Sequence, residues 1–96
     1  MEIKKTIEGQ KATFEVEGWL DTQTAPEFGV ALDELSGDVT QLDLDFEKLE
    51  YVSSAGIRQI VSAYKKMNGN LTIRNVSPAV REVLRLTGVD KRLHIA

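Results

Sequence analysis

The sequence contains no cysteine, which excludes a disulfide scaffold, a thiolate zinc site and a cysteine nucleophile together, and fits a reducing cytoplasm. Long apolar runs are also missing, so we expect neither a membrane-spanning helix nor a signal peptide. Basic residues are fewer than acidic ones, 12 against 15, and the net charge of −3 argues against nucleic acid as the main partner. The 96 residues are predicted to form one small, soluble, cytoplasmic domain spanning 1–96.

Residues that perform catalysis or hold metals are scarce. The one histidine, His94, lies near the C-terminus, where a surface position is expected. No glycine-rich phosphate loop is present, and Ser62-Ala-Tyr-Lys65 matches the S-x-x-K motif only by its letters. Asp43 and Asp45 could hold a hard cation, although a solvated strand face is the expected explanation. The sequence therefore predicts a protein that is not an enzyme and needs no metal or cofactor.

Apolar periodicity divides the chain into short elements. Ala12, Phe14 and Val16 recur at every second residue, as in a half-buried strand. Thr24 and Glu27 have the spacing of a capping box at the start of a helix. The expected elements are a β-hairpin over 2–7 and 11–18, a helix from 24 that ends before 37, a strand over 41–46, a helix whose apolar stripe covers 57–67, a strand over 71–74, a helix from 78 to 87 and a short last strand over 93–96.

This order predicts an α/β fold. Strands that alternate with helices of about a dozen residues imply parallel pairing through right-handed crossovers. We expect one mixed, mostly parallel β-sheet of four to five strands, opened by the hairpin, with about three helices packed mainly on one face. In the last helix Val80, Val83, Leu84 and Thr87 should face inward. Since each strand is apolar on one face only, the other face should be wetted; it would carry Thr13, Glu15, Asp43, Asp45, Thr72 and Arg74.

The segment Tyr51-Val-Ser-Ser-Ala-Gly-Ile-Arg58 joins a strand to the second helix. Ser53 or Ser54 can accept a backbone N–H there as an N-cap, and the small Ala55-Gly56 pair allows the first turn to approach neighbouring backbone. Ordinary capping explains the pair. The second hypothesis is that Ser54 accepts a phosphate, since a helix N-terminus offers unpaired N–H donors and partial positive charge. A dianion there would change the surface rather than the fold.

Three separated stretches carry a resemblance to a known family. Tyr51-Val-Ser-Ser-Ala-Gly-Ile followed by an amphipathic helix resembles the signature of the STAS domain, the family that includes the bacterial anti-sigma factor antagonists. Gly18-Trp-Leu-Asp-Thr-Gln-Thr-Ala25 is similar to the family's G-x-L-D-x-x-T-A turn, and Thr87-Gly-Val-Asp-Lys91 is similar to its T-G-L-D-K turn. The order of elements agrees along essentially the whole chain.

The resemblance implies partner switching. In such a system the unphosphorylated domain binds an anti-sigma factor that is also a serine kinase, the kinase phosphorylates it with ATP, and a phosphatase resets it. Carried over by position, the phosphoacceptor is Ser54, with Ser53 as the alternative, and Asp21 is an acidic residue near it. We expect a monomer without direct membrane insertion. The expected partner-binding residues are Trp19, Asp21, Thr24, Ser53, Ser54, Gly56 and Arg58.

Two alternatives stay open at this point. Trp19 is either a lid on the edge of the core or an aromatic anchor for a partner. The protein itself is either a phosphorylation switch or a constitutive STAS subunit of a lipid-transport ATPase complex or signalling scaffold. The neutral Ser53, where switch members often have an acid, and the chain end at Ala96, where many relatives continue into one more helix, favour the constitutive subunit. Ala55, where switch members often have a second hydroxyl, leaves Ser53 as the only alternative acceptor.

Overall fold

Apart from one additional strand, β4, strands and helices follow one another in the order that the sequence predicts, in a computed structural model that describes all residues 1–96. A short 3₁₀ turn, η1, precedes the last strand. The bounds are β1 Glu2–Glu8, β2 Lys11–Leu20, α1 Ala25–Asp33, β3 Gln41–Asp45, β4 Leu49–Val52, α2 Ser54–Lys66, β5 Leu71–Arg74, α3 Pro78–Leu86, η1 Val89–Lys91 and β6 His94–Ile95.

The sheet is mixed and mostly parallel, as predicted. The hairpin pair β1–β2 is antiparallel, and the pairs β2–β3, β3–β5 and β5–β6 are parallel. A sixth strand, β4, was not expected; it pairs in parallel with the end of β2. The ten-residue β2 therefore has two neighbours on one edge: its first half pairs with β3 and its last residues pair with β4. The pairing with β3 ends at Glu15, and the pairing with β4 contains a register shift between Gly18, whose φ is +98°, and Trp19.

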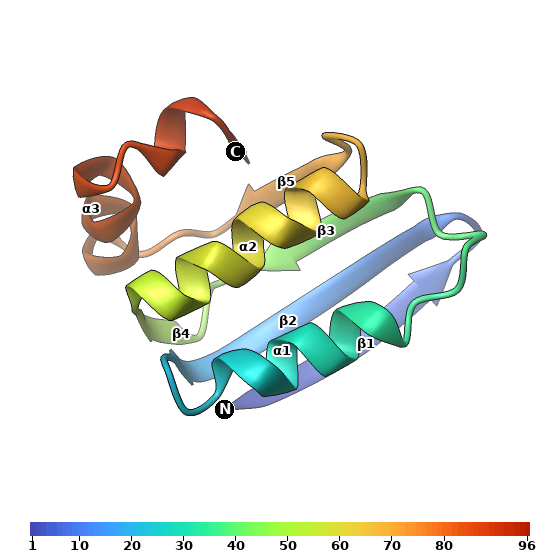
Figure 1. The fold of residues 1–96 in the computed structure, drawn as a ribbon, viewed down its shortest axis with the longest axis horizontal. Helices are drawn as coiled ribbons and strands as arrows, with labels where there is room; N and C mark the ends of the chain where they lie inside the picture. The colour runs from blue at the N-terminus through green and yellow to red at the C-terminus, as the bar shows by residue number, and fades with distance from the viewer.

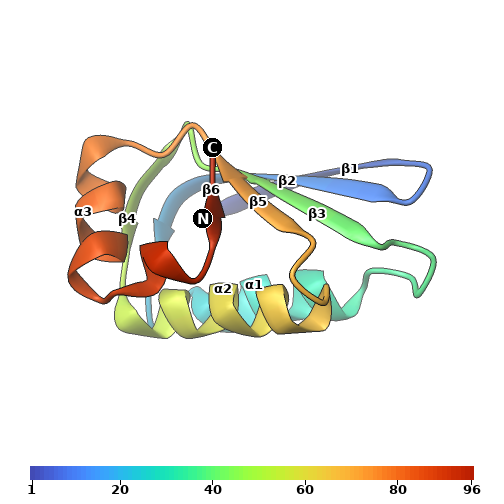
Figure 2. The ribbon, with the colours of Figure 1, turned by 90° about the horizontal axis from the view of Figure 1, so that it is seen from above.

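Two layers make up the molecule. Helices α1 and α2 lie side by side across one face of the sheet, and α3 stands at the end of the sheet against β4 (Figures 1 and 2). The buried side chains of the inner strand faces and helices form one core, in which the Phe14 and Phe28 rings meet edge to face at 6.1 Å between centroids. No helix is both long and apolar enough to cross a membrane.

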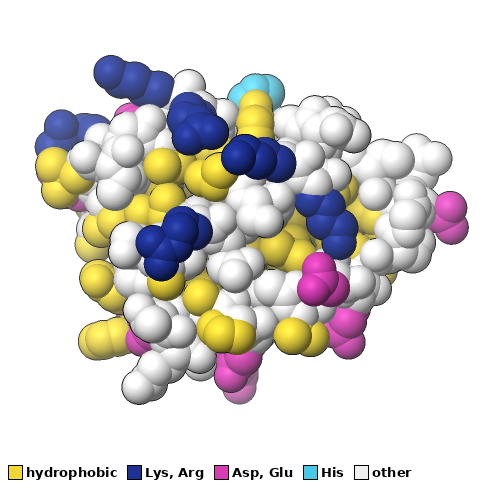
Figure 3. Space-filling view, viewed as in Figure 1, with side chains coloured by type: hydrophobic (Ala, Val, Ile, Leu, Met, Phe, Trp, Pro, Cys, Tyr) yellow, Lys and Arg dark blue, Asp and Glu magenta, His cyan; other side chains and the backbone are white.

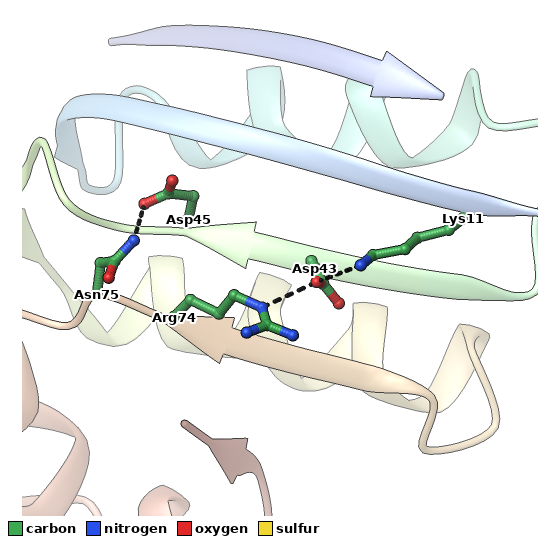
Figure 4. Close-up of polar contacts among 5 residues, drawn as sticks. All are labelled: Lys11, Asp43, Asp45, Arg74 and Asn75. Atoms are coloured by element: carbon green, nitrogen blue, oxygen red, sulfur yellow. Dashed lines mark hydrogen bonds and ion pairs between the residues drawn. The ribbon is translucent and has the colours of Figure 1, made fainter. Parts of the chain in front are cut away.

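The opposite face of the sheet is largely polar, with one exception to the wetted surface that we expected. Asp43 is only 2% exposed, because the side chains of Lys11 and Arg74 from the two neighbouring strands close over its carboxylate (Figure 4). Lys11 Nζ and Arg74 Nε lie 3.1 and 2.9 Å from Asp43 Oδ2. The carboxylate of Asp43 thus pairs with two cations of the chain itself, and Asp45 Oδ1 accepts a hydrogen bond from Asn75 Nδ2 at 3.1 Å. Burial raises the pKa of Asp43, but the hydrogen bonds and charges of Lys11 and Arg74 outweigh it and lower the pKa overall.

Three local expectations differ in detail. Thr24 precedes α1 but its side chain makes no capping bond, so the capping box with Glu27 does not form. Thr87 is exposed, because its hydroxyl donates to the Val83 and Leu84 carbonyls at the end of α3 instead of turning inward. Helix α1 ends at Asp33, earlier than Gly37. By contrast, Ser77 caps α3 by accepting the Val80 amide at 3.2 Å.

Candidate partner-binding site at the start of helix α2

Strands β2 and β4 end side by side, and this brings the two principal motifs together. Leu20 and Val52 are register partners in this parallel pair. The Ser53 amide then donates to the Leu20 carbonyl at 2.9 Å. Asp21 and Ser53 are the next residues of their strands, so the acidic turn and the serine pair leave the sheet at the same edge.

The two adjacent serines have different environments. Ser53 is half-buried in extended backbone and is the N-cap of α2; its Oγ accepts the Gly56 amide at 3.3 Å. Ser54 is the first residue of the helix and is exposed. The capping role therefore belongs to Ser53, and the Ser54 hydroxyl stands on the surface where the unpaired amides of the first turn are concentrated.

Gly56 places the first turn of α2 against the sheet. A Cβ at this position would lie 2.6 Å from the Leu20 carbonyl oxygen and 2.9 Å from Val52 Cγ2, closer than real Cβ contacts. Gly56 is itself buried, so it presents little surface for the direct partner contact that we predicted. Its lack of a side chain lets the helix start close to the ends of β2 and β4, which fixes where the serines stand.

The turn after β2 is built around Asp21 and Thr24. Asp21 Oδ1 accepts the Gln23 and Thr24 amides at 3.0 and 3.1 Å. The Thr24 hydroxyl lies 3.1 Å from the same oxygen, donates to the Trp19 carbonyl and accepts the Asp21 amide. The Thr24 amide, followed by its hydroxyl and the Gln23 amide, holds the pKa of Asp21 below its ordinary value. Asp21 is therefore a half-buried negative charge held in place by the turn, and the hydrogen bonds of the Thr24 hydroxyl are used within the turn.

Trp19 does not cover the core. Its side chain is 55% exposed and packs on Tyr51, which is 43% exposed, with ring centroids 5.5 Å apart. The indole Nε1 donates to Glu50 Oε2 at 3.3 Å. Of the two alternatives for Trp19, the lid on the core is thus excluded, and an exposed aromatic pair lies beside the site.

Tyr51 is a surface residue that we did not predict, because β4 itself was missed. One signal was available: Trp19 and Tyr51 each come directly before a buried apolar residue, Leu20 and Val52, at the end of a strand. If the two strands pair in register, both aromatic rings must lie on the same side.

Arg58 lies one turn further along α2 and is exposed. With Ser54 it occupies positions i and i+4 of the helix, which share a face. The surface around the helix start thus combines an exposed hydroxyl, a carboxylate, a guanidinium and two aromatic rings. None of the hollows on the chain is lined by Asp21, Ser53 or Ser54.

A family model described as "Mlab, STAS domain" matches residues 3–95 of the chain. The chain belongs to the STAS-domain family. This confirms the family that the three sequence motifs indicated, and the single α/β domain agrees with the fold expected for a STAS domain.

Solved structures give the same fold. An anti-sigma factor antagonist from Mycobacterium paratuberculosis is 24% identical, with a TM-score of 0.86 over 98% of this chain and 83% of that one. A putative anti-sigma factor antagonist from Thermotoga maritima is 18% identical, with a TM-score of 0.86 over 97% and 84%. The unphosphorylated anti-sigma factor antagonist SpoIIAA is 21% identical, with a TM-score of 0.76 over 99% and 88%. At these identities the likeness establishes the STAS fold.

Proposed function

We propose that this STAS domain is an anti-sigma factor antagonist-like regulatory protein. It binds an anti-sigma factor that has serine-kinase activity, and reversible phosphorylation of Ser54 switches that binding. The observation that carries the proposal is that the two serines have different positions: Ser53 caps α2, and Ser54 is exposed on the first turn of the helix. A phosphate on Ser54 therefore replaces no structural hydrogen bond of the helix cap.

The helix start can accept the phosphate without unfolding. The N-terminus of the 13-residue helix α2 carries partial positive charge, which favours a dianion by about 0.3–1 kcal/mol at an exposed position. The same phosphate adds close to two negative charges to the surface that Asp21 already makes negative. A partner that presents acidic or closely packed groups to this surface is repelled, whereas the domain keeps its fold.

The partner surface consists of the exposed groups around the helix start. Trp19 supplies apolar area that a partner can bury, and Asp21 and Arg58 supply fixed charges of opposite sign. Gly56 and Thr24 act as positioning residues, because one is buried and the other is used inside its turn. The names of similar structures support the proposal: SpoIIAA, an anti-sigma factor antagonist, is known in an unphosphorylated and a phosphorylated form.

Phosphotransfer to Ser54 is the test. The purified chain is incubated with its candidate anti-sigma factor kinase and ATP, and its intact mass is followed by mass spectrometry. We expect a gain of one phosphate group that Ser54→Ala abolishes and Ser53→Ala retains. Modification of Ser54→Ala at the wild-type rate would move the acceptor, with Ser53 as the alternative. A kinase that modifies its established antagonist but leaves this chain unmodified would refute the switch.

Reversible phosphorylation of Ser54 requires further components besides this domain. A serine phosphatase must return the chain to the unphosphorylated form, and ATP is bound by the kinase rather than by this domain. We propose that the domain works in the cytoplasm and as a monomer. Sedimentation of the purified chain at micromolar concentration checks the oligomeric state, and a dimer would contradict it.

A second candidate is a constitutive STAS subunit of a lipid-transport ATPase complex or of a signalling scaffold. The description of the matching family model names Mlab and no anti-sigma factor, and this is the observation that favours it. The neutral Ser53 and the methyl group of Ala55 beside the acceptor agree with a surface that is not phosphorylated. Affinity purification of the tagged chain from its native cells separates the candidates: the first predicts a serine kinase, the second an ATPase or scaffold protein.

A further inference from the structure

The two halves of the chain carry opposite charge. Residues 1–53 contain 13 acidic and 4 basic residues, whereas residues 54–96 contain 8 basic and 2 acidic ones. On the helix face, most of the visible Lys and Arg side chains lie over α2 and the C-terminal segment, and most of the Asp and Glu side chains lie toward α1 and the loop after it (Figure 3). A protein with a net charge of −3 thus presents one basic surface.

A groove of about 470 Å³ lies on this basic surface between α2 and η1. Its floor is apolar and consists of Ile57 and Val61 from the helix and Val89 from the 3₁₀ turn. Ile57 and Val89 are 6% and 7% exposed, and Val61 is half-buried. Ile57 and Val89 therefore belong to the core and expose little area, and Val61 supplies most of the apolar surface that a ligand can cover.

Three cations stand around this floor: Arg58 and Lys65 on α2, and Arg92 just after η1. All three are exposed, and the four ion pairs of the chain use other residues. Arg58 and Lys65 are seven residues apart, so they project from the same side of the helix two turns apart. The rim is thus a set of like charges, none of which forms an ion pair with a carboxylate of the chain.

We propose that this groove binds an acidic amphipathic segment of the partner protein. Apolar side chains of the segment cover Ile57, Val61 and Val89, and its carboxylates pair with Arg58, Lys65 and Arg92. An apolar floor inside a basic rim is complementary to a segment with those two kinds of side chain, and charge complementarity of this kind sets specificity and association rate. The inference rests on the proposed function and names the partner's chemistry, because the groove begins one turn from Ser54.

An unbiased peptide library displayed on phage is the probe, selected on the immobilised, unphosphorylated full chain. We expect enrichment of peptides that combine Asp or Glu with apolar residues, and amide NMR shifts of the bound chain that map to α2 and η1. Arg92→Glu should weaken the best peptide about tenfold or more. Lys4→Glu is the matched control, since it makes the same charge change on exposed β1 and should leave the affinity within about twofold.

Each result that contradicts the proposal either assigns the groove to a different ligand or shows that it binds no acidic segment. Selected peptides without acidic residues, or shifts confined to other surfaces, would overturn the proposal. A dimer in sedimentation that Arg92→Glu dissolves would assign the groove to a second copy of the chain. Stronger binding to phosphatidylglycerol vesicles than to any peptide, lost in Arg92→Glu, would assign it to a lipid surface. No kinase or phosphate takes part in these experiments. A failure of the groove proposal can therefore be distinguished from a failure of the proposed phosphorylation of Ser54.

Discussion

Substitution of Gly56 by alanine tests how closely α2 must approach the sheet. The added Cβ would lie 2.6 Å from the Leu20 carbonyl oxygen, 2.8 Å from Leu20 Cγ and 2.9 Å from Val52 Cγ2. Two strand ends that belong to the sheet supply these atoms, so neither can move far. The helix start must shift instead, and with it the amides around Ser54.

The cost can be worked from two opposing terms. Overpacking of a well-packed site costs about 1–3 kcal/mol, and the upper part of that range applies where three contacts, one of them to backbone, are too short. Alanine gains about 0.5–1 kcal/mol over glycine inside a helix. We therefore expect Gly56→Ala to lose about 1–2 kcal/mol of unfolding free energy. For a domain of this size, that lowers Tm by roughly 5–15 °C.

Gly29→Ala is the matched control. Gly29 also lies inside a helix, but its nearest neighbour is the flexible end of Gln59, at 3.2 Å. This variant should be unchanged or more stable by up to about 1 kcal/mol. Urea unfolding of both variants, followed by circular dichroism, gives the two free energies. Equal stability of Gly56→Ala and the wild type would show that the close approach of α2 is not a constraint.

Three further predictions concern single side chains. Asp43→Asn should lose about 1–3 kcal/mol of unfolding free energy at pH 7, because charge-assisted hydrogen bonds to a buried carboxylate are lost. Folding lowers the pKa of Asp43, so the carboxylate stabilises the fold above its ordinary pKa of 3.8, and this stabilisation is lost as the pH falls below that value. Urea unfolding at decreasing pH should therefore show the stabilities of the wild type and the variant converging. Ser53→Ala should lower the unfolding free energy by about 1 kcal/mol because it removes the α2 cap, whereas Ser54→Ala should stay within about 0.5 kcal/mol of the wild type. Equal losses of stability in calorimetry would contradict the assignment of the capping role to Ser53 alone. Trp19→Ala should change Tm little but weaken partner binding by more than about 1 kcal/mol in calorimetric titration, and undiminished affinity would remove Trp19 from the interface.

The regular part of the fold is encoded locally and could be predicted. Alternation along β2 and the apolar stripes of α2 and α3 are properties of short stretches, so the order of the elements other than β4 followed from the sequence. Strand β4 was missed because its four residues are buried only at the two ends, without the alternation of a strand. It is stabilised by pairing with the end of β2, a contact between segments about 30 residues apart.

The candidate site likewise has features that depend on local sequence and features that depend on contacts between distant segments. The serine pair at a helix start is a local motif, and its position was correctly inferred from the sequence. Which serine caps the helix depends on how β4 enters α2, and the burial of Asp43 depends on Lys11 and Arg74 from two other strands. Such contacts are set by the sheet register, which the sequence pattern alone did not reveal.

Under the proposed function, a phosphate on Ser54 changes which protein binds and leaves the fold intact. The most direct measurement compares the unmodified chain with a chain carrying phosphoserine at position 54, in both Tm and affinity for a candidate anti-sigma factor. We expect Tm to change by no more than about 5 °C, since an anion at a helix start is tolerated, and the affinity to fall at least about tenfold. A large drop in Tm, or an affinity that the phosphate does not alter, would contradict the account.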